Sequence, residues 1–144
     1  MSEDVHSPAR VEASLPAEAR SIGQARALLS GFLHNEVLDD ELRSDALLVV
    51  SELVTNAIRH GSRPADKVGV DFTIHGRRLS IGVRDAARGL TTPAARARDN
   101  QRMGGRGLDI VAQLATVSER LLEGRRELRA ELPLRRRDSL DRRR

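Results

Sequence analysis

The stretch SELVTNAIRHG, residues 51–61, decides the fold assignment. It closes a helix that Asp39 or Asp40 is expected to cap at its start and that is expected to run to about residue 60. At roughly 100° per residue, Glu52 and Asn56 lie about 40° apart on one helix face. The apolar residues cover the opposite arc: Ala46, Leu47, Val50, Leu53, Val54 and Ala57. We therefore expect a carboxylate and an amide on the face away from the core, a pattern that an ordinary solvated helix face also shows.

Hydrophobic periodicity predicts the other elements of the chain. The expected elements are a strand at 10–15, a helix at 21–37 capped by Ser21, hairpin strands at 68–75 and 79–85, a helix at 108–115, and hairpin strands at 117–122 and 127–132. Hairpins beside clustered helices indicate an α+β two-layer domain, with an antiparallel or mixed, mostly antiparallel, sheet and helices on one face. We place this domain at residues 10–134, between disordered segments at 1–9 and 135–144.

Length and composition narrow the class of protein. A chain of 144 residues fits one domain, and the absence of cysteine excludes disulfides and thiolate zinc sites. The first ten residues, MSEDVHSPAR, carry acids where a signal peptide needs a basic region, and no apolar run approaches the roughly 20 residues of a membrane span. A cytoplasmic protein without membrane contact is expected.

The net charge of +4 belongs to the C-terminal tail. Residues 135–144 contain six arginines and two aspartates, whereas residues 1–134 hold 19 basic and 19 acidic residues. Phe32 and Phe72 are the only aromatic residues, too few for a platform on which nucleic-acid bases stack. Both observations argue against nucleic-acid binding.

Small residues gather where a strand is expected to end and where a helix is expected to begin. Asp85 closes a predicted strand and is followed by Gly89, and residues 86–103 lack periodicity and form a long loop of the kind that is usually functional. The third helix is preceded by Gly104, Gly105 and Gly107, whose bare backbone N–H groups suit phosphate binding. A plain helix start also fits, and the spacing matches neither a P-loop nor a Rossmann fingerprint.

This order of motifs resembles the gyrase, Hsp90, histidine kinase and MutL (GHKL) superfamily, whose ATP-binding fold is the Bergerat fold. Within it, the chain is most similar to the compact anti-sigma-factor serine kinases of bacteria. The stretch 51–61 looks like the N box, 85–89 like the first glycine box and 104–108 like the second.

The resemblance implies binding of ATP and Mg²⁺. Asn56 would bind the metal, Glu52 would act as general base, and Asp85 would accept from the adenine amino group. Arg59 or His60 would lie near the phosphates or ribose, and residues 86–103 would form a lid. The remaining nucleotide contacts implied are Gly89, Gly104, Gly105, Arg106, Gly107 and Leu108. The implied partners are a sigma factor and a STAS-type anti-anti-sigma protein, with a homodimer possible.

Two positions depart from the family pattern. Ala87 replaces a glycine of the first glycine box, and Arg126 or Glu127 replaces a threonine common in the last strand near the adenine. These departures favour an alternative, a module of the same fold that binds ATP weakly or not at all and regulates by protein binding. A histidine-kinase catalytic domain is a further alternative, but His34 lacks the acidic neighbour expected before a phospho-accepting histidine.

The charge distribution yields a first prediction. Deletion of residues 135–144 is expected to leave thermal unfolding and Mg²⁺-ATP affinity unchanged and to remove any salt-sensitive adhesion to polyanions. Calorimetry on the full and shortened chains measures the unfolding temperature and the Mg²⁺-ATP affinity. Loss of ATP binding on truncation would contradict the placement of residues 135–144 outside the ATP-binding domain.

Overall fold

The computed structural model describes residues 9–87 and 106–134, and it confirms the expected order of helices and strands. The elements are β1 (Ala9–Pro16), α1 (Arg20–Phe32), α2 (Asp40–Asn56), the π-helical turn η1 (Ala57–Gly61), β2 (Lys67–His75), β3 (Arg78–Asp85), α4 (Arg106–Leu114), β4 (Thr116–Leu122) and β5 (Arg125–Pro133). No helix within these two ranges is long and apolar enough to cross a membrane.

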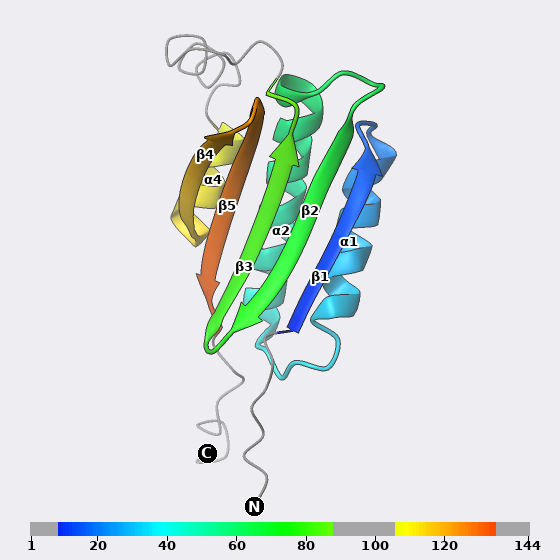
Figure 1. Ribbon diagram of the computed structural model, residues 1–144. Helices are drawn as coiled ribbons and strands as arrows, with labels where there is room; N and C mark the ends of the chain where they lie inside the picture. Colours follow the sequence, from blue (N-terminus) through cyan, green and yellow to red (C-terminus); the bar gives the residue numbers. More distant parts are fainter. Residues whose placement is uncertain (1–8, 88–105, 135–144) are drawn as a thin grey trace, which may run out of the picture.

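The five strands form one sheet with the order β1-β2-β3-β5-β4. Each pair of neighbours is antiparallel, so the sheet is antiparallel rather than mixed. Helices α1, α2 and α4 all lie on one face of it (Figure 1). The structure confirms the two-layer α+β fold, and no helix of the described residues covers the other face of the sheet.

Alternating side chains explain why the helices cover only one face. In β2, Val68, Val70 and Phe72 are buried against the helices, and β3 and β5 repeat the alternation with leucine, isoleucine, valine and alanine. Helix α2 buries an apolar stripe that includes Val50 and Leu53. Because the hydrophobic effect scales with the apolar area removed from water, this shared interior drives the sheet and helices together.

The expected start of α2 is confirmed, whereas the expected limits of α1 are wrong. Asp39 caps α2 by accepting from the Leu42 N–H at 2.7 Å. Helix α1 ends at Phe32 instead of continuing to residue 37, because Arg43 of α2 donates to the carbonyl groups of Leu33 at 3.0 Å and Glu36 at 2.6 Å. These bonds satisfy backbone carbonyls that a longer helix would have paired internally.

Ser21 does not cap α1. The helix begins at Arg20, and Ser21 is a buried residue of its first turn whose hydroxyl donates to the carbonyl of Pro16 at 2.5 Å. This bond ties the start of the helix to the end of β1, so the hydroxyl serves a tertiary contact instead of a helix terminus.

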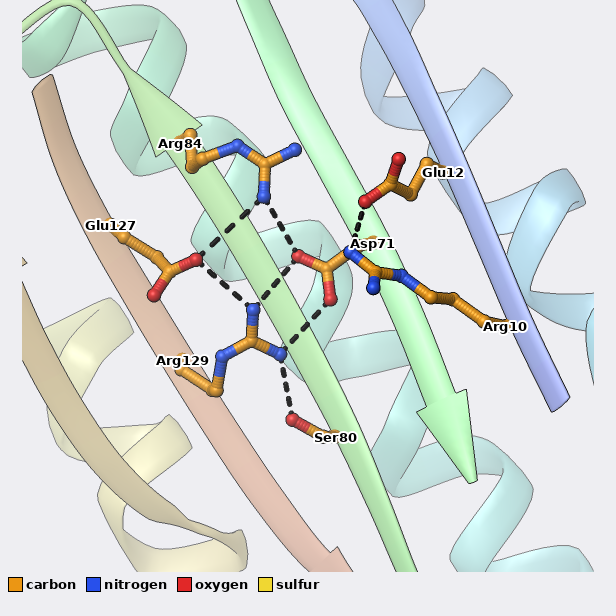
Figure 2. Close-up of polar contacts among 7 residues, drawn as sticks. All are labelled: Arg10, Glu12, Asp71, Ser80, Arg84, Glu127 and Arg129. Carbon is orange, nitrogen blue, oxygen red and sulfur yellow. Dashed lines mark hydrogen bonds and ion pairs between the residues drawn. The ribbon is translucent and has the colours of Figure 1, made fainter. Parts of the chain in front are cut away.

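A network of ion pairs covers the centre of the helix-free face (Figure 2). Asp71 of β2 accepts from Arg129 of β5 at 2.9 and 3.0 Å and from Arg84 of β3 at 3.1 Å, while Glu127 also lies 3.0 Å from Arg129. Gly82 gives this network room, because a Cβ there would lie 2.4 Å from both the Arg129 Nη2 and the Asp71 Oδ1 atoms. The two arginines cover Asp71 so closely that it is only 2% exposed.

We predict that Asp71→Asn lowers the free energy of unfolding by about 1–3 kcal/mol, because two guanidinium groups lose a charged acceptor. The matched control is Glu12→Gln, in the exposed Arg10–Glu12 pair of the neighbouring strand, where a change below about 1 kcal/mol is expected. Denaturant unfolding measures both variants. Equal losses at the two positions would show that the network contributes no more than a surface pair.

Candidate functional site

Three buried polar side chains meet where α2 passes the ends of two strands. Asn56 is the last residue of α2, Asp85 the last of β3, and Arg126 the second of β5. The register of the sheet places Asp85 directly opposite Arg126. All three residues are at most 3% exposed, so their polar groups are shielded from water by the protein.

Arg126 connects the other two side chains. Its Nε and Nη2 atoms donate to Oδ2 of Asp85 at 3.0 and 2.7 Å, and its Nη2 atom also donates to Oδ1 of Asn56 at 3.0 Å. The second carboxylate oxygen of Asp85 accepts from the Ala87 N–H at 2.8 Å. These are charge-assisted hydrogen bonds in a site of low dielectric, where such bonds are strong.

Burial raises the pKa of the Asp85 carboxyl above its ordinary value, although the Arg126 guanidinium and the Ala87 N–H both act to lower it. The charge of Glu119 on β4 adds to the increase. The ionised carboxylate therefore depends on the donors that surround it. A buried carboxylate with a perturbed pKa is a common feature of ligand-binding sites.

Ala87 adopts the backbone conformation that glycine favours. Its φ of 54° lies in the left-handed region, and this turn brings its N–H back onto Asp85. A side chain in that region costs roughly 1–2 kcal/mol. The departure from the first glycine box thus leaves the turn in a glycine-like conformation, at an energetic cost.

Gly61 brings the backbone of η1 directly against the same carboxylate. A Cβ at this position would lie 2.1 Å from the Asp85 Cγ atom, so only glycine permits the approach. The sequence predicts Gly61 as a helix stop and does not show this contact. Helix α2 was expected to continue to about residue 60 in α-helical form, whereas its last turn is π-helical, a geometry frequent at functional sites.

The candidate general base, Glu52 of α2, lies against the start of α4. Glu52 is half-buried on α2, and a Cβ at Gly107 would lie 2.5 Å from its Oε2 atom. The first turn of α4 therefore approaches the carboxylate as closely as a bare backbone allows. This contact joins the stretch that resembles the N box to the one that resembles the second glycine box.

The expectation that Glu52 and Asn56 share a face away from the core is wrong for Asn56, which is 1% exposed. Its burial depends on Arg126, which supplies a polar partner from a strand 70 residues further along the chain. The sequence singles out Arg126 only as one of two residues, with Glu127, that stand where the family pattern has a threonine. The alternation of β5 contains the signal, because Arg126 shares the inward face with Leu128, Ala130 and Leu132.

Other predicted site residues are only partly placed. Arg59 is exposed and His60 half-buried on η1, directly after Asn56, and Leu108 is half-buried near the start of α4. Gly89, Gly104, Gly105, nearly all of the expected lid and the side chain of Arg106 lie outside the described residues. Their roles remain predictions.

The residues present fit a nucleotide with a bound metal, except at one point. Asn56 offers a hard oxygen of the kind Mg²⁺ prefers, and its buried Nδ2 has no hydrogen-bond partner among the described residues. Gly61 and Gly107 let the backbone approach the Asp85 and Glu52 carboxylates more closely than any residue with a Cβ would allow. The exception is Arg126, which already binds the oxygens of Asp85 and Asn56.

Comparison with known proteins identifies a family and relatives that match most of the chain. The profile described as histidine kinase-like ATPase domain matches residues 15–130. A serine-protein kinase RsbW from Staphylococcus epidermidis is 28% identical over 72% of this chain and 74% of its own, and one from Halalkalibacterium halodurans is 26% identical over 64% of this chain. The chain spans only 57% of the length of the latter.

A solved structure supports the fold independently. The crystal structure of the RsbU and RsbW domains of Rv1364c from Mycobacterium tuberculosis matches with a TM-score of 0.64 at 19% identity, over 88% of this chain and 32% of that one. At this identity the likeness concerns the fold alone. Since the family profile covers most of the sequence and the fold agrees, the chain belongs to the histidine kinase-like ATPase domain family.

Proposed function

We propose that this chain is an ATP-dependent serine kinase that phosphorylates a STAS-type anti-anti-sigma protein and sequesters a sigma factor when that partner is not engaged. The observation that carries the proposal is the contact between Glu52 and Gly107. A carboxylate lies against a helix start with a bare backbone, so a possible proton acceptor and a site suited to phosphate lie side by side. The similarity to the RsbW serine-protein kinases supports the choice of acceptor.

The nucleotide would lie between two ends of the site. Asp85, buried beside Gly61, would accept from the adenine amino group at one end. At the other, the oxygen of Asn56 and the N-terminus of α4 would face the phosphates, where the helix dipole favours negative charge. Mg²⁺, when bound, would neutralise charge on the phosphates.

Glu52 would act on the protein substrate. Its carboxylate would accept the hydroxyl proton of the partner's serine as that oxygen forms its bond to phosphorus. Glu52 is half-buried, and its carboxylate lies against the first turn of α4. Asn56, one helical turn further on, would hold the metal without touching the serine. Such a kinase would act in the bacterial cytoplasm, alone or as a homodimer.

A second candidate function is a protein-binding module of the same fold without catalysis. The observation that favours it is the ion pair of Arg126 with Asp85, which already uses the acceptor expected to bind adenine. Such a module would occlude a sigma factor and would transfer no phosphate. The two candidates differ in what Glu52 does.

Glu52→Gln preserves shape but removes the charge of the expected base. We predict nearly unchanged Mg²⁺-ATP affinity and phosphate transfer reduced by roughly 10²-fold or more, the usual share of general-base catalysis. Asn56→Ala should instead weaken Mg²⁺-ATP binding itself. Radiolabelled transfer to an anti-anti-sigma protein and calorimetric titration measure the two effects.

The control is Glu41→Gln, which removes the same charge from the exposed first turn of α2 and should change neither quantity. Circular dichroism checks that Asn56→Ala folds. Equal transfer rates in the parent and Glu52→Gln would exclude Glu52 as the base. If ATP binds but neither protein transfers phosphate, the binding module is the better description.

A further inference from the structure

Arg126 is the largest fully buried side chain among the described residues, and it is charged. Removing a guanidinium group from water is costly unless it is paired and hydrogen-bonded. Here the compensation comes from Asp85 and Asn56, the two residues that the proposed function assigns to adenine and Mg²⁺. The partners of this arginine are thus the proposed ligand-binding atoms themselves.

We propose that Arg126 is an internal competitor of the nucleotide, a residue that lowers ATP affinity by occupying Asp85 and Asn56 until the ligand displaces it. The inference rests on the proposed function only in assuming that nucleotide binds at these two residues. It is independent of whether Glu52 catalyses transfer.

The hydrogen-bond capacity of Asp85 supports competition at the end of the site where adenine would bind. A carboxylate has about four lone-pair sites, and three bonds are already made on Asp85: two from Arg126 and one from the Ala87 N–H. An adenine amino group would be a further donor to a nearly saturated carboxylate. One acceptor site remains, and the guanidinium beside it neutralises the charge that would strengthen a bond from the amino group, so displacement of Arg126 would strengthen adenine binding.

Electrostatics supports competition at the metal end. The Arg126 Nη2 atom lies 3.0 Å from Oδ1 of Asn56, the oxygen expected to coordinate Mg²⁺. Two cations on one buried oxygen repel each other, and the repulsion is stronger at the low effective dielectric of a buried site than in water. Metal and guanidinium therefore exclude one another at Asn56.

The strand register explains why the arginine is held in this position. Arg126 faces inward directly opposite Asp85, whereas Arg129 of the same strand points to the helix-free face and binds Asp71. Arg126 and Arg129 thus belong to separate clusters. Arg126 contacts the residues proposed to bind nucleotide, whereas Arg129 contacts Asp71 on the other face.

The test is calorimetric titration of Mg²⁺-ATP and of adenosine into the full chain and three variants. Arg126→Thr removes the charge and the reach, and Arg126→Gln keeps an amide donor for Asp85 without the charge. Arg125→Thr, at an exposed neighbouring position, is the control with the same change in net charge. Removing a positive charge ordinarily weakens the binding of an anion, so a gain in affinity has the opposite sign to the general electrostatic effect.

We expect Arg126→Thr to bind both ligands more tightly, Mg²⁺-ATP by roughly ten- to a hundredfold, the value of one or two charge-assisted hydrogen bonds. Arg126→Gln should show a smaller gain, and Arg125→Thr none. Unchanged or weaker binding in both Arg126 variants, with ATP still bound by the parent, would overturn the competitor while leaving the proposed function intact. If no folded protein of the series bound nucleotide, the proposed function and the competitor would both fail.

Loss of Arg126 leaves a buried carboxylate unpaired, so a variant that fails to fold needs a measurement on the parent chain. The buried Nε–H of Arg126 is bonded to Asp85 and should give a protected arginine side-chain signal in NMR spectra. We expect saturating Mg²⁺-ATP to shift this signal and abolish its protection. An unchanged, protected signal at saturation would show that nucleotide binds without displacing Arg126.

Discussion

The ion pair between Asp85 and Arg126 is the interaction on which the arrangement of the site depends. Its members come from adjacent strands at directly opposed positions, and Asn56 joins them from α2. Two backbone features contact the Asp85 carboxylate. The π-helical turn brings Gly61 against it, and Ala87 accepts a costly left-handed conformation that points an N–H at it. The hydrogen bonds of the Arg126 guanidinium therefore connect the end of α2 to the end of β3 and the start of β5.

The two faces of the sheet use the same chemistry with different consequences. On the helix-free face, Asp71 is shared by Arg84 and Arg129, whose side chains remain 32% and 25% exposed. The Arg84 and Arg129 side chains keep part of their hydration, whereas Asp71 itself is buried, so desolvation opposes the attraction less here than in the interior. In the interior, Arg126 and Asp85 are both fully desolvated, and the cost of desolvation offsets most of the attraction. The outer network thus stabilises the sheet, whereas the inner pair contributes chiefly to how the site is organised.

Most of the fold could be predicted from the sequence, because alternation in the strands and periodicity in the helices report burial locally. The wrong predictions concern a helix end and a buried side chain that are set by residues elsewhere in the chain. Arg43 ends α1 early, and Arg126 buries Asn56 from 70 residues away. The resemblance assigned Glu52 and Gly107 separate roles at the nucleotide, and their direct contact could not be predicted because periodicity does not say how α2 and α4 pack. The glycines at 104 and 105 lie outside the described residues, so that half of the phosphate site remains a prediction from sequence.

In the proposed function, the site has an adenine end, where this chain departs from the family pattern, and a phosphate end, where Glu52 and Gly107 follow it. If Arg126 competes with nucleotide, a substitution at the adenine end would act on the fraction of molecules that can accept nucleotide. If the competent fraction were about one in a hundred, the apparent affinity would fall by about a hundredfold, while the rate at saturation would stay the same. Binding and chemistry would then be set by different residues, Arg126 and Glu52. The occupancy of such a kinase would follow the nucleotide concentration over a range in which a tight-binding relative is already saturated, so weak binding alone does not distinguish an inactive module from a kinase.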